Sequence, residues 1–93
     1  MVKHIVFFKN SDKAKVAELK TKLEALKEEI DFIVDLEVGI DFVGSERSFD
    51  LALLVDLPTR ESLNAYAIHP KHTPIVEWVK ANGFESKAVD YEY

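Results

Sequence analysis

The chain has 93 residues, a formal net charge of -5 from 12 basic and 17 acidic side chains, and no cysteine. This length predicts a single domain over residues 1–93 with a small core that a partner subunit would extend. The acidic balance argues against nucleic acid, whose phosphates need basic side chains. The lack of cysteine excludes disulfides and thiolate nucleophiles or metal ligands. No apolar run is long enough to span a membrane or to act as a signal peptide, so we expect a cytoplasmic protein with no membrane partner.

The first half of the chain begins with a strand at residues 2–9, VKHIVFFK, which is rich in β-branched and aromatic residues. Side chains alternate across a strand, so both faces are apolar, with Val2, His4, Val6 and Phe8 on one and Ile5 and Phe7 on the other. Ser11 and Asp12 then offer N-cap oxygens to a helix. Its apolar stripe recurs at steps of three and four, at Val16, Leu19, Leu23, Leu26 and Ile30.

Two further strands follow. Residues 33–42 alternate, with an apolar face predicted at Val34, Leu36, Val38, Ile40 and Phe42. The segment 44–48, GSERS, has the composition of a hairpin loop. Residues 49–57 form the third predicted strand, with an apolar face of Phe49, Leu51, Leu53, Val55 and Leu57.

The second half of the chain predicts two short helices and a final strand. Pro58 and Thr59 end the third strand and cap a helix at residues 60–68, which stops at His69 because the residue before a proline leaves the helical region. Thr73 as N-cap and Pro74 at the first helical position predict a helix over 73–82, closed by Gly83. Residues 84–93 alternate and form the fourth predicted strand.

The order β-α-β-β-α-β, with the second α broken, predicts the α+β class and a ferredoxin-like protomer. In that fold a four-stranded antiparallel sheet carries its helices on one face. Either the face bearing Val6 and Phe8 or the one bearing Ile5 and Phe7 then lies away from the helices and needs a cover. A second copy of the chain is the simplest cover, since symmetric dimers are the commonest oligomers. Substitutions at Val6, Phe8 or Tyr91 would then dissociate or unfold the dimer.

The stretch YAIHPKHTPIVEWV, residues 66–79, concentrates the chemically active side chains. Tyr66, His69 and His72 would form a ligand site if they shared a cavity with His4. Alternatively, the two turn histidines bind backbone groups freed by the prolines, Tyr66 packs on the sheet and His4 is a core residue. A metal site is the weaker reading, because His69 leaves the helix before Pro70 and only Glu77 or Asp50 could complete it.

Three segments together are similar to one family: KHIVFFK near the start, Y-A-I-H-P-K-H from Tyr66 to His72, and VDYE from Val89 to Glu92. They resemble the stress-responsive dimeric α/β-barrel (Dabb) domain family over essentially the whole chain. The resemblance implies a protomer that forms a homodimer through its sheet, giving a dimeric α+β barrel with a pocket between sheet and helices.

The resemblance also implies a chemistry. In polyketide-cyclase members of the family, a tyrosine and the second histidine of this turn act on a poly-β-keto chain, which carries over to Tyr66 and His72. We therefore expect Tyr66 and His72 as catalytic residues in aldol chemistry, His4 and His69 as substrate contacts, a small apolar or aromatic ligand and no cofactor. A non-catalytic stress-related structural protein and a cofactor-free monooxygenase of the same barrel fold stay open as alternatives.

Overall fold

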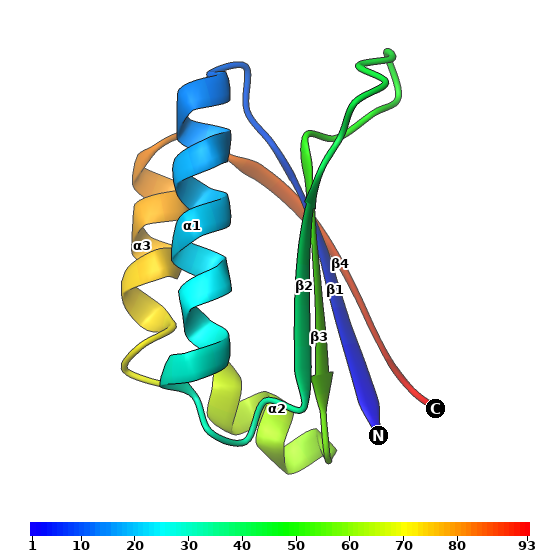
Figure 1. The fold of residues 1–93 in the computed structure, drawn as a ribbon, viewed down its shortest axis with the longest axis vertical. Helices are drawn as coiled ribbons and strands as arrows, with labels where there is room; N and C mark the ends of the chain where they lie inside the picture. Colours follow the sequence, from blue (N-terminus) through cyan, green and yellow to red (C-terminus); the bar gives the residue numbers. More distant parts are fainter.

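A computed structural model describes all 93 residues and has the predicted ferredoxin-like topology (Figure 1). Its elements are β1 (Val2–Lys9), α1 (Lys13–Glu29), β2 (Asp35–Ile40), β3 (Leu51–Leu57), α2 (Arg60–Ala67), α3 (Thr73–Ala81) and β4 (Glu85–Glu92). The second helix is split into α2 and α3, as the prolines predict. None of these helices has the length and apolar content needed to cross a membrane.

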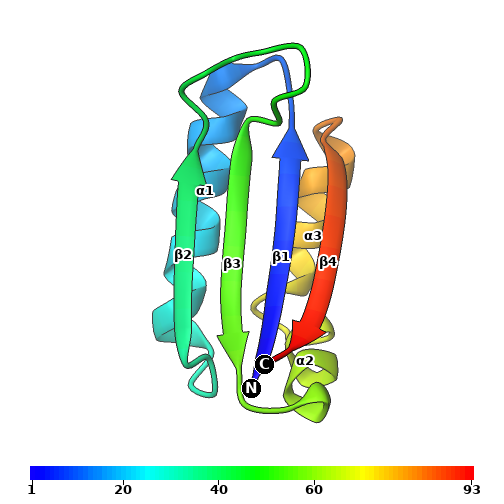
Figure 2. The ribbon, with the colours of Figure 1, turned by 90° about the vertical axis from the view of Figure 1, so that its right-hand side faces the viewer.

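The four strands form one antiparallel sheet in the order β2-β3-β1-β4. All three helices lie on one face, here called the inner face, and no element covers the opposite, outer face (Figure 2). The core lies between α1 and the inner face. Val2, Val6 and Phe8 of β1 point into it, together with the predicted stripe of α1 and the alternate residues of β3 from Leu51 to Leu57.

Local chemistry fixes the ends of the helices much as predicted. The Asp12 carboxylate accepts from the backbone N–H groups of Ala14 and Lys15, at 3.0 and 3.4 Å, and starts α1. Thr59 and Ser62 form a reciprocal capping box at the start of α2. Gly83 adopts a φ of 73° directly after α3, a conformation that favours glycine and ends the helix.

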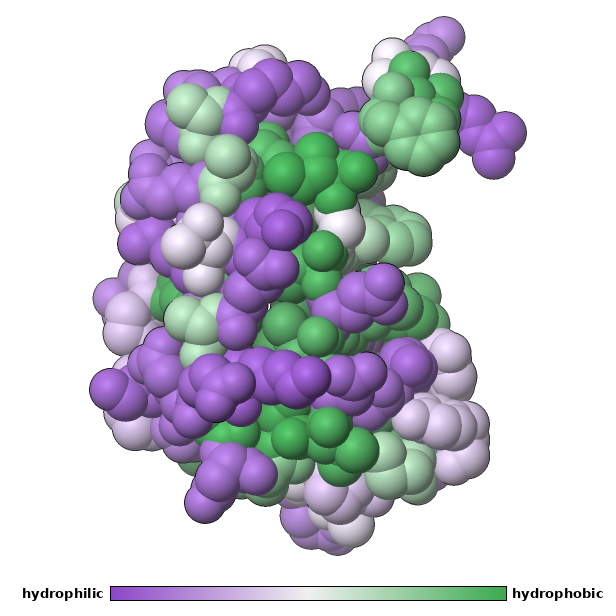
Figure 3. All heavy atoms as spheres, in the orientation of Figure 1, coloured by the Kyte–Doolittle hydropathy of each residue, from purple (hydrophilic) through white to green (hydrophobic).

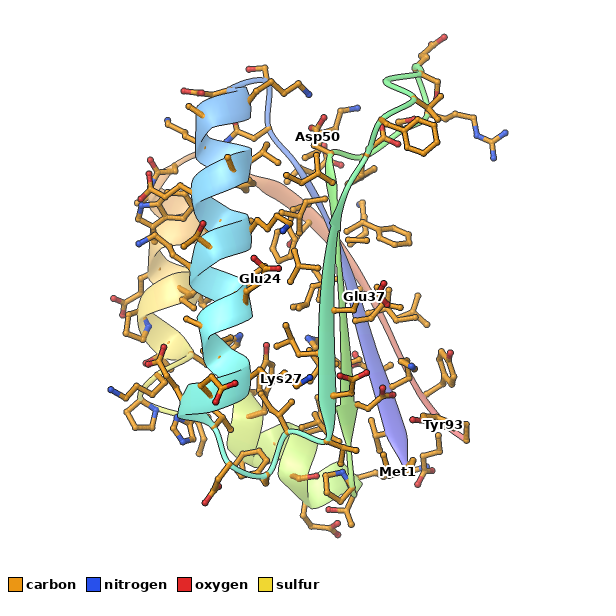
Figure 4. All side chains as sticks on the ribbon, viewed as in Figure 1. Met1, Glu24, Lys27, Glu37, Asp50 and Tyr93 are labelled. Carbon is orange, nitrogen blue, oxygen red and sulfur yellow. The ribbon has the colours of Figure 1, made fainter.

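The hairpin between β2 and β3 is longer than predicted. β2 ends at Ile40 and β3 begins at Leu51, which pairs with Ile40 on one side and with Phe8 of β1 on the other. The connection projects beyond the sheet and carries exposed apolar side chains below its hydrophilic tip (Figure 3). One of its residues, Phe42, is 96% exposed. The Asp50 carboxylate anchors its base to the backbone N–H of Asn10 at 2.9 Å and to Lys13 at 2.6 Å (Figure 4).

The structure shows which face of β1 the helices cover. Val6 and Phe8 are buried under the helices, so of the two faces that the sequence left open, the one bearing Ile5 and Phe7 lies away from the helices. Substitutions at Val6 or Phe8 are therefore expected to unfold the protomer. Phe7 occupies the outer face instead and is 46% exposed. Other apolar residues of β4 and the C-terminus are also largely exposed, namely Val89, Tyr91 and Tyr93. At the open end of the sheet the chain termini lie together, with the Tyr93 N–H donating to the Met1 carbonyl at 3.1 Å (Figure 4).

Candidate functional site

The turn between α2 and α3 is held by its two histidines. In an uninterrupted helix the Lys71 N–H would donate to the Ala67 carbonyl, four residues earlier. Pro70 breaks that pattern, and each of the two groups forms a hydrogen bond with an imidazole ring instead. The Lys71 N–H donates to Nδ1 of His69 at 3.1 Å, and Nδ1 of His72 lies 3.1 Å from the Ala67 carbonyl oxygen. Each ring thus replaces one half of a lost helical hydrogen bond.

The start of α3 differs from the prediction for a related reason. The N-cap residue is His72, not Thr73, and it makes no side-chain cap. The backbone N–H groups of His72 and Thr73 both donate to the His69 carbonyl, at 2.9 and 3.0 Å, so the chain already curls helically before Thr73. This tight turn brings the His72 ring back towards α2 rather than out to solvent.

The hydrogen bond to Ala67 fixes the proton on the His72 ring. A carbonyl oxygen only accepts, so Nδ1 must donate, and in the neutral ring Nε2 is then left with a free lone pair. Burial lowers the pKa of His72, the nearby His4 and His69 act in the same direction, and the Ala67 hydrogen bond partly opposes them. The ring is therefore neutral near pH 7, the form that can accept a proton.

Tyr66 lies against both of the other candidate rings. Its ring centroid is 4.3 Å from that of His72, in a tilted stack, and 5.6 Å from that of His4, edge to face. The residue is only 1% exposed, and its hydroxyl is buried without a hydrogen-bond partner. Such a group costs roughly 1–3 kcal/mol when unpaired. Burial raises the pKa of the phenol, so it stays protonated and able to donate.

His4 has a carboxylate partner that the sequence analysis missed. The register of β1 and β4 places Asp90 directly opposite His4, and Oδ1 of Asp90 is in hydrogen-bond contact with Nδ1 of His4. A carboxylate in this position accepts a hydrogen bond from Nδ1 and leaves Nε2 free. Pairing the first strand with the last would have revealed Asp90, but alternation alone marked it only as a polar position.

A cavity of about 280 Å³ lies between α3 and the strands β1 and β4, here called the inner cavity. Its 13 lining residues include 9 hydrophobic ones. The polar lining residues are His4, His72, Lys80 and Ser86. This is the mostly apolar enclosure with a few polar groups that is typical of small-molecule sites, at the lower end of their size range. His4 and His72 line it, and Tyr66 lies directly behind them.

His69 is not part of this arrangement. Its ring packs edge to face against Phe32, with centroids 6.1 Å apart, and does not line the inner cavity. Its placement supports the capping role rather than the expected substrate contact. No group of three or more His, Asp or Glu side chains is arranged to hold a metal, and Asp50 is already engaged with Asn10 and Lys13.

Comparison with known proteins agrees with this fold. The model of the Stress Responsive A/B Barrel Domain family, Dabb, matches residues 2–93. A dimeric protein of unknown function with a ferredoxin-like fold from Bacteroides fragilis is 30% identical, with 99% of this chain and 95% of that chain covered and a TM-score of 0.84. No curated protein sequence matches the chain.

Two more distant structures share the fold. A dimeric ferredoxin-like protein of unknown function from Thermobifida fusca is 23% identical over 99% of this chain and 90% of that chain, with a TM-score of 0.85. A candidate antibiotic biosynthesis monooxygenase from Deinococcus radiodurans is 15% identical over 100% and 92%, with a TM-score of 0.80.

Proposed function

Because the chain belongs to the Dabb family, we propose that it is a homodimer that binds a small apolar or aromatic molecule in the inner cavity and catalyses polyketide-cyclase-like aldol chemistry there. One observation carries the proposal. His4 and His72 both line an apolar cavity, and in both rings Nδ1 is engaged by the protein while Nε2 is left free for a bound molecule.

In the proposed reaction His72 is the base. Its Nε2 takes a proton from a carbon between two carbonyls, and the electron pair of that C–H bond becomes the enolate. The enolate carbon then attacks a second carbonyl of the chain and forms a C–C bond. The resulting alkoxide takes the proton back from the His72 imidazolium, so the base is restored.

Tyr66 and His4 assist this step. The neutral Tyr66 hydroxyl, which has no partner in the protein, is the proposed hydrogen-bond donor to the enolate oxygen. Tyr66 lies behind the cavity wall, and donors of this kind commonly reach their full geometry only in the substrate complex. His4, held by Asp90, orients the substrate carbonyl.

The outer face supports the homodimer. Phe7, Val89, Tyr91 and Tyr93 are all between 46% and 61% exposed there. Burying one such large apolar side chain is worth about 1.5–3 kcal/mol. Beside them the projecting hairpin bounds a groove of about 380 Å³ that includes Phe7 and Phe42. The Bacteroides fragilis relative is described as dimeric, and a second copy of this chain is the occupant we propose for this face.

The dimer is tested by Phe7→Asp, which places a charge at the centre of the outer face. We expect the dissociation constant to rise at least a hundredfold, since a carboxylate that loses water in the interface is costly even with Lys87 opposite it on β4. Sedimentation equilibrium measures it. Ile68→Asp is the control, because Ile68 is 78% exposed but follows α2 on the helical side. An unchanged dimer in Phe7→Asp would contradict the assigned interface.

The ligand site is tested by His72→Ala beside His69→Ala. Thermal shifts and turnover are measured with aromatic and polyketide-like acids. A ligand at a hundred times its Kd stabilises the native protein by about 2.7 kcal/mol. We expect His72→Ala to lose the shift and the turnover, while His69→Ala, changed at the same turn but outside the cavity, retains both. Unchanged binding in His72→Ala would contradict the site.

A structural role is the second candidate, and the capping bonds of His69 and His72 favour it. If the turn serves only to join α2 to α3, both variants lose a little stability and neither changes any ligand response. The monooxygenase alternative is tested separately by oxygen uptake with quinol substrates, in which the wild-type protein but not His72→Ala would consume oxygen.

A further inference from the structure

The two ends of the inner cavity differ in chemistry. His4 of β1 pairs with Asp90 of β4, and Phe8 of β1 pairs with Ser86 of β4. His4 and Phe8 are four residues apart, which is about 13 Å of strand. Along α3, eight residues separate His72 from Lys80, which is about 12 Å of helix. Both elements run in the same direction in Figure 1. The two walls therefore place His4 and His72 at one end of the cavity and Lys80 and Ser86 at the other.

Between these ends the lining is apolar, formed mainly by Val6, Ile75, Val76, Val79 and Ala88. No Asp or Glu lines the cavity, although the chain carries 17 acidic residues and a net charge of -5. Lys80 takes part in none of the ion pairs of the structure. Lys80, an exposed residue, thus stands without a counter-ion at the end of an apolar cavity that no acidic residue lines.

We propose that the inner cavity selects an elongated apolar acid, whose carboxylate binds Lys80 and Ser86 while a carbonyl at its other end meets His4 and His72. This rests on the proposed function and names the substrate class of that site. A singly charged carboxylate suits the donors better than a phosphate does. One amine and one hydroxyl offer few hydrogen bonds, and Lys80 lies in the last turn of α3, where the helix dipole disfavours a dianion.

The test uses a series of benzoylalkanoates, in which two to six methylenes join a phenyl ketone to a carboxylate, and the methyl ester of each. Binding is measured by titration calorimetry to the wild-type protein and to Lys80→Gln and Lys80→Arg. Lys20→Gln is the matched control, because it removes one positive charge from the exposed pair with Glu24 on α1, outside the cavity.

We expect the wild-type protein to bind the best acid about tenfold more tightly than its ester, the usual scale of a hydrogen bond to a charged group. Lys80→Gln should lose that preference and leave ester binding unchanged, whereas Lys80→Arg and Lys20→Gln should keep it. Equal binding of acid and ester, or a preference that survives in Lys80→Gln, overturns this inference and leaves the proposed function standing. Binding of neither class to the wild-type protein overturns both.

Discussion

The two halves of the inner face are packed very differently. Under the 17-residue α1, the side chains of Leu19, Leu23 and Leu26 are 0–1% exposed. The 9-residue α3 approaches no strand as closely as α1 approaches β2, and Ile75 and Val76 on it are only half-buried. The inner cavity lies on this less closely packed side, between α3 and the strands β1 and β4. The candidate site thus lies where packing is least complete.

The strongest test of this difference in packing compares the loss of stability in Leu26→Ala with the loss in Ile75→Ala. Removing a fully buried leucine from a packed core costs about 2–5 kcal/mol, whereas truncating a residue that already borders a cavity should cost less than about 1.5 kcal/mol. Urea unfolding at one fixed protomer concentration measures both, since a dimer's stability depends on concentration. Equal losses would show that the α3 side is as tightly packed as the α1 side.

Tyr66→Phe should abolish turnover without lowering the free energy of unfolding. Removing a buried hydroxyl that has no partner should leave the free energy of unfolding unchanged or raise it by about 1 kcal/mol. Turnover should nevertheless be lost, because the enolate donor is gone. The same unfolding measurement, combined with an activity assay, checks both. A clear loss of stability would mean that the hydroxyl is hydrogen-bonded in solution.

His69→Ala should have a smaller effect, about 0.5–1 kcal/mol of lost stability, because it removes one partly exposed hydrogen bond to the Lys71 N–H. His69→Asn, which keeps an acceptor near that N–H, should recover part of the loss. Thermal unfolding of both variants gives the comparison. A loss above 2 kcal/mol would place His69 in the core rather than at the turn.

The smallest expected effect is a pH dependence at His72. Burial lowers its pKa below the ordinary 6.5, so between the lowered value and 6.5 the unfolded chain binds more protons than the folded one. Stability therefore rises with pH through that window and is lost as pH falls through it. His72→Gln should flatten this slope in unfolding measured across the window. An unchanged slope would assign the titration to another group.

The order of elements was predictable because periodicity and capping act locally. The α1 stripe, the Thr59 cap and the role of Gly83 all follow from residues close in sequence. The length of the hairpin before Leu51 depended instead on how far β3 pairs with its neighbouring strands. The Asp90 partner of His4 depended on strand register. Lys80 lay on the cavity wall only because of how α3 stands relative to the sheet. These are contacts between distant segments, which spacing alone does not specify.

The imidazoles of the α2–α3 turn have a consequence for how this site could evolve. Because His69 and His72 replace helical hydrogen bonds, the loss of either would be penalised in folding, whatever molecule the cavity binds. The turn can therefore outlast a change of substrate. New specificities would arise more easily through the apolar wall and the Lys80 end, where a substitution alters what fits without disturbing how the chain is joined.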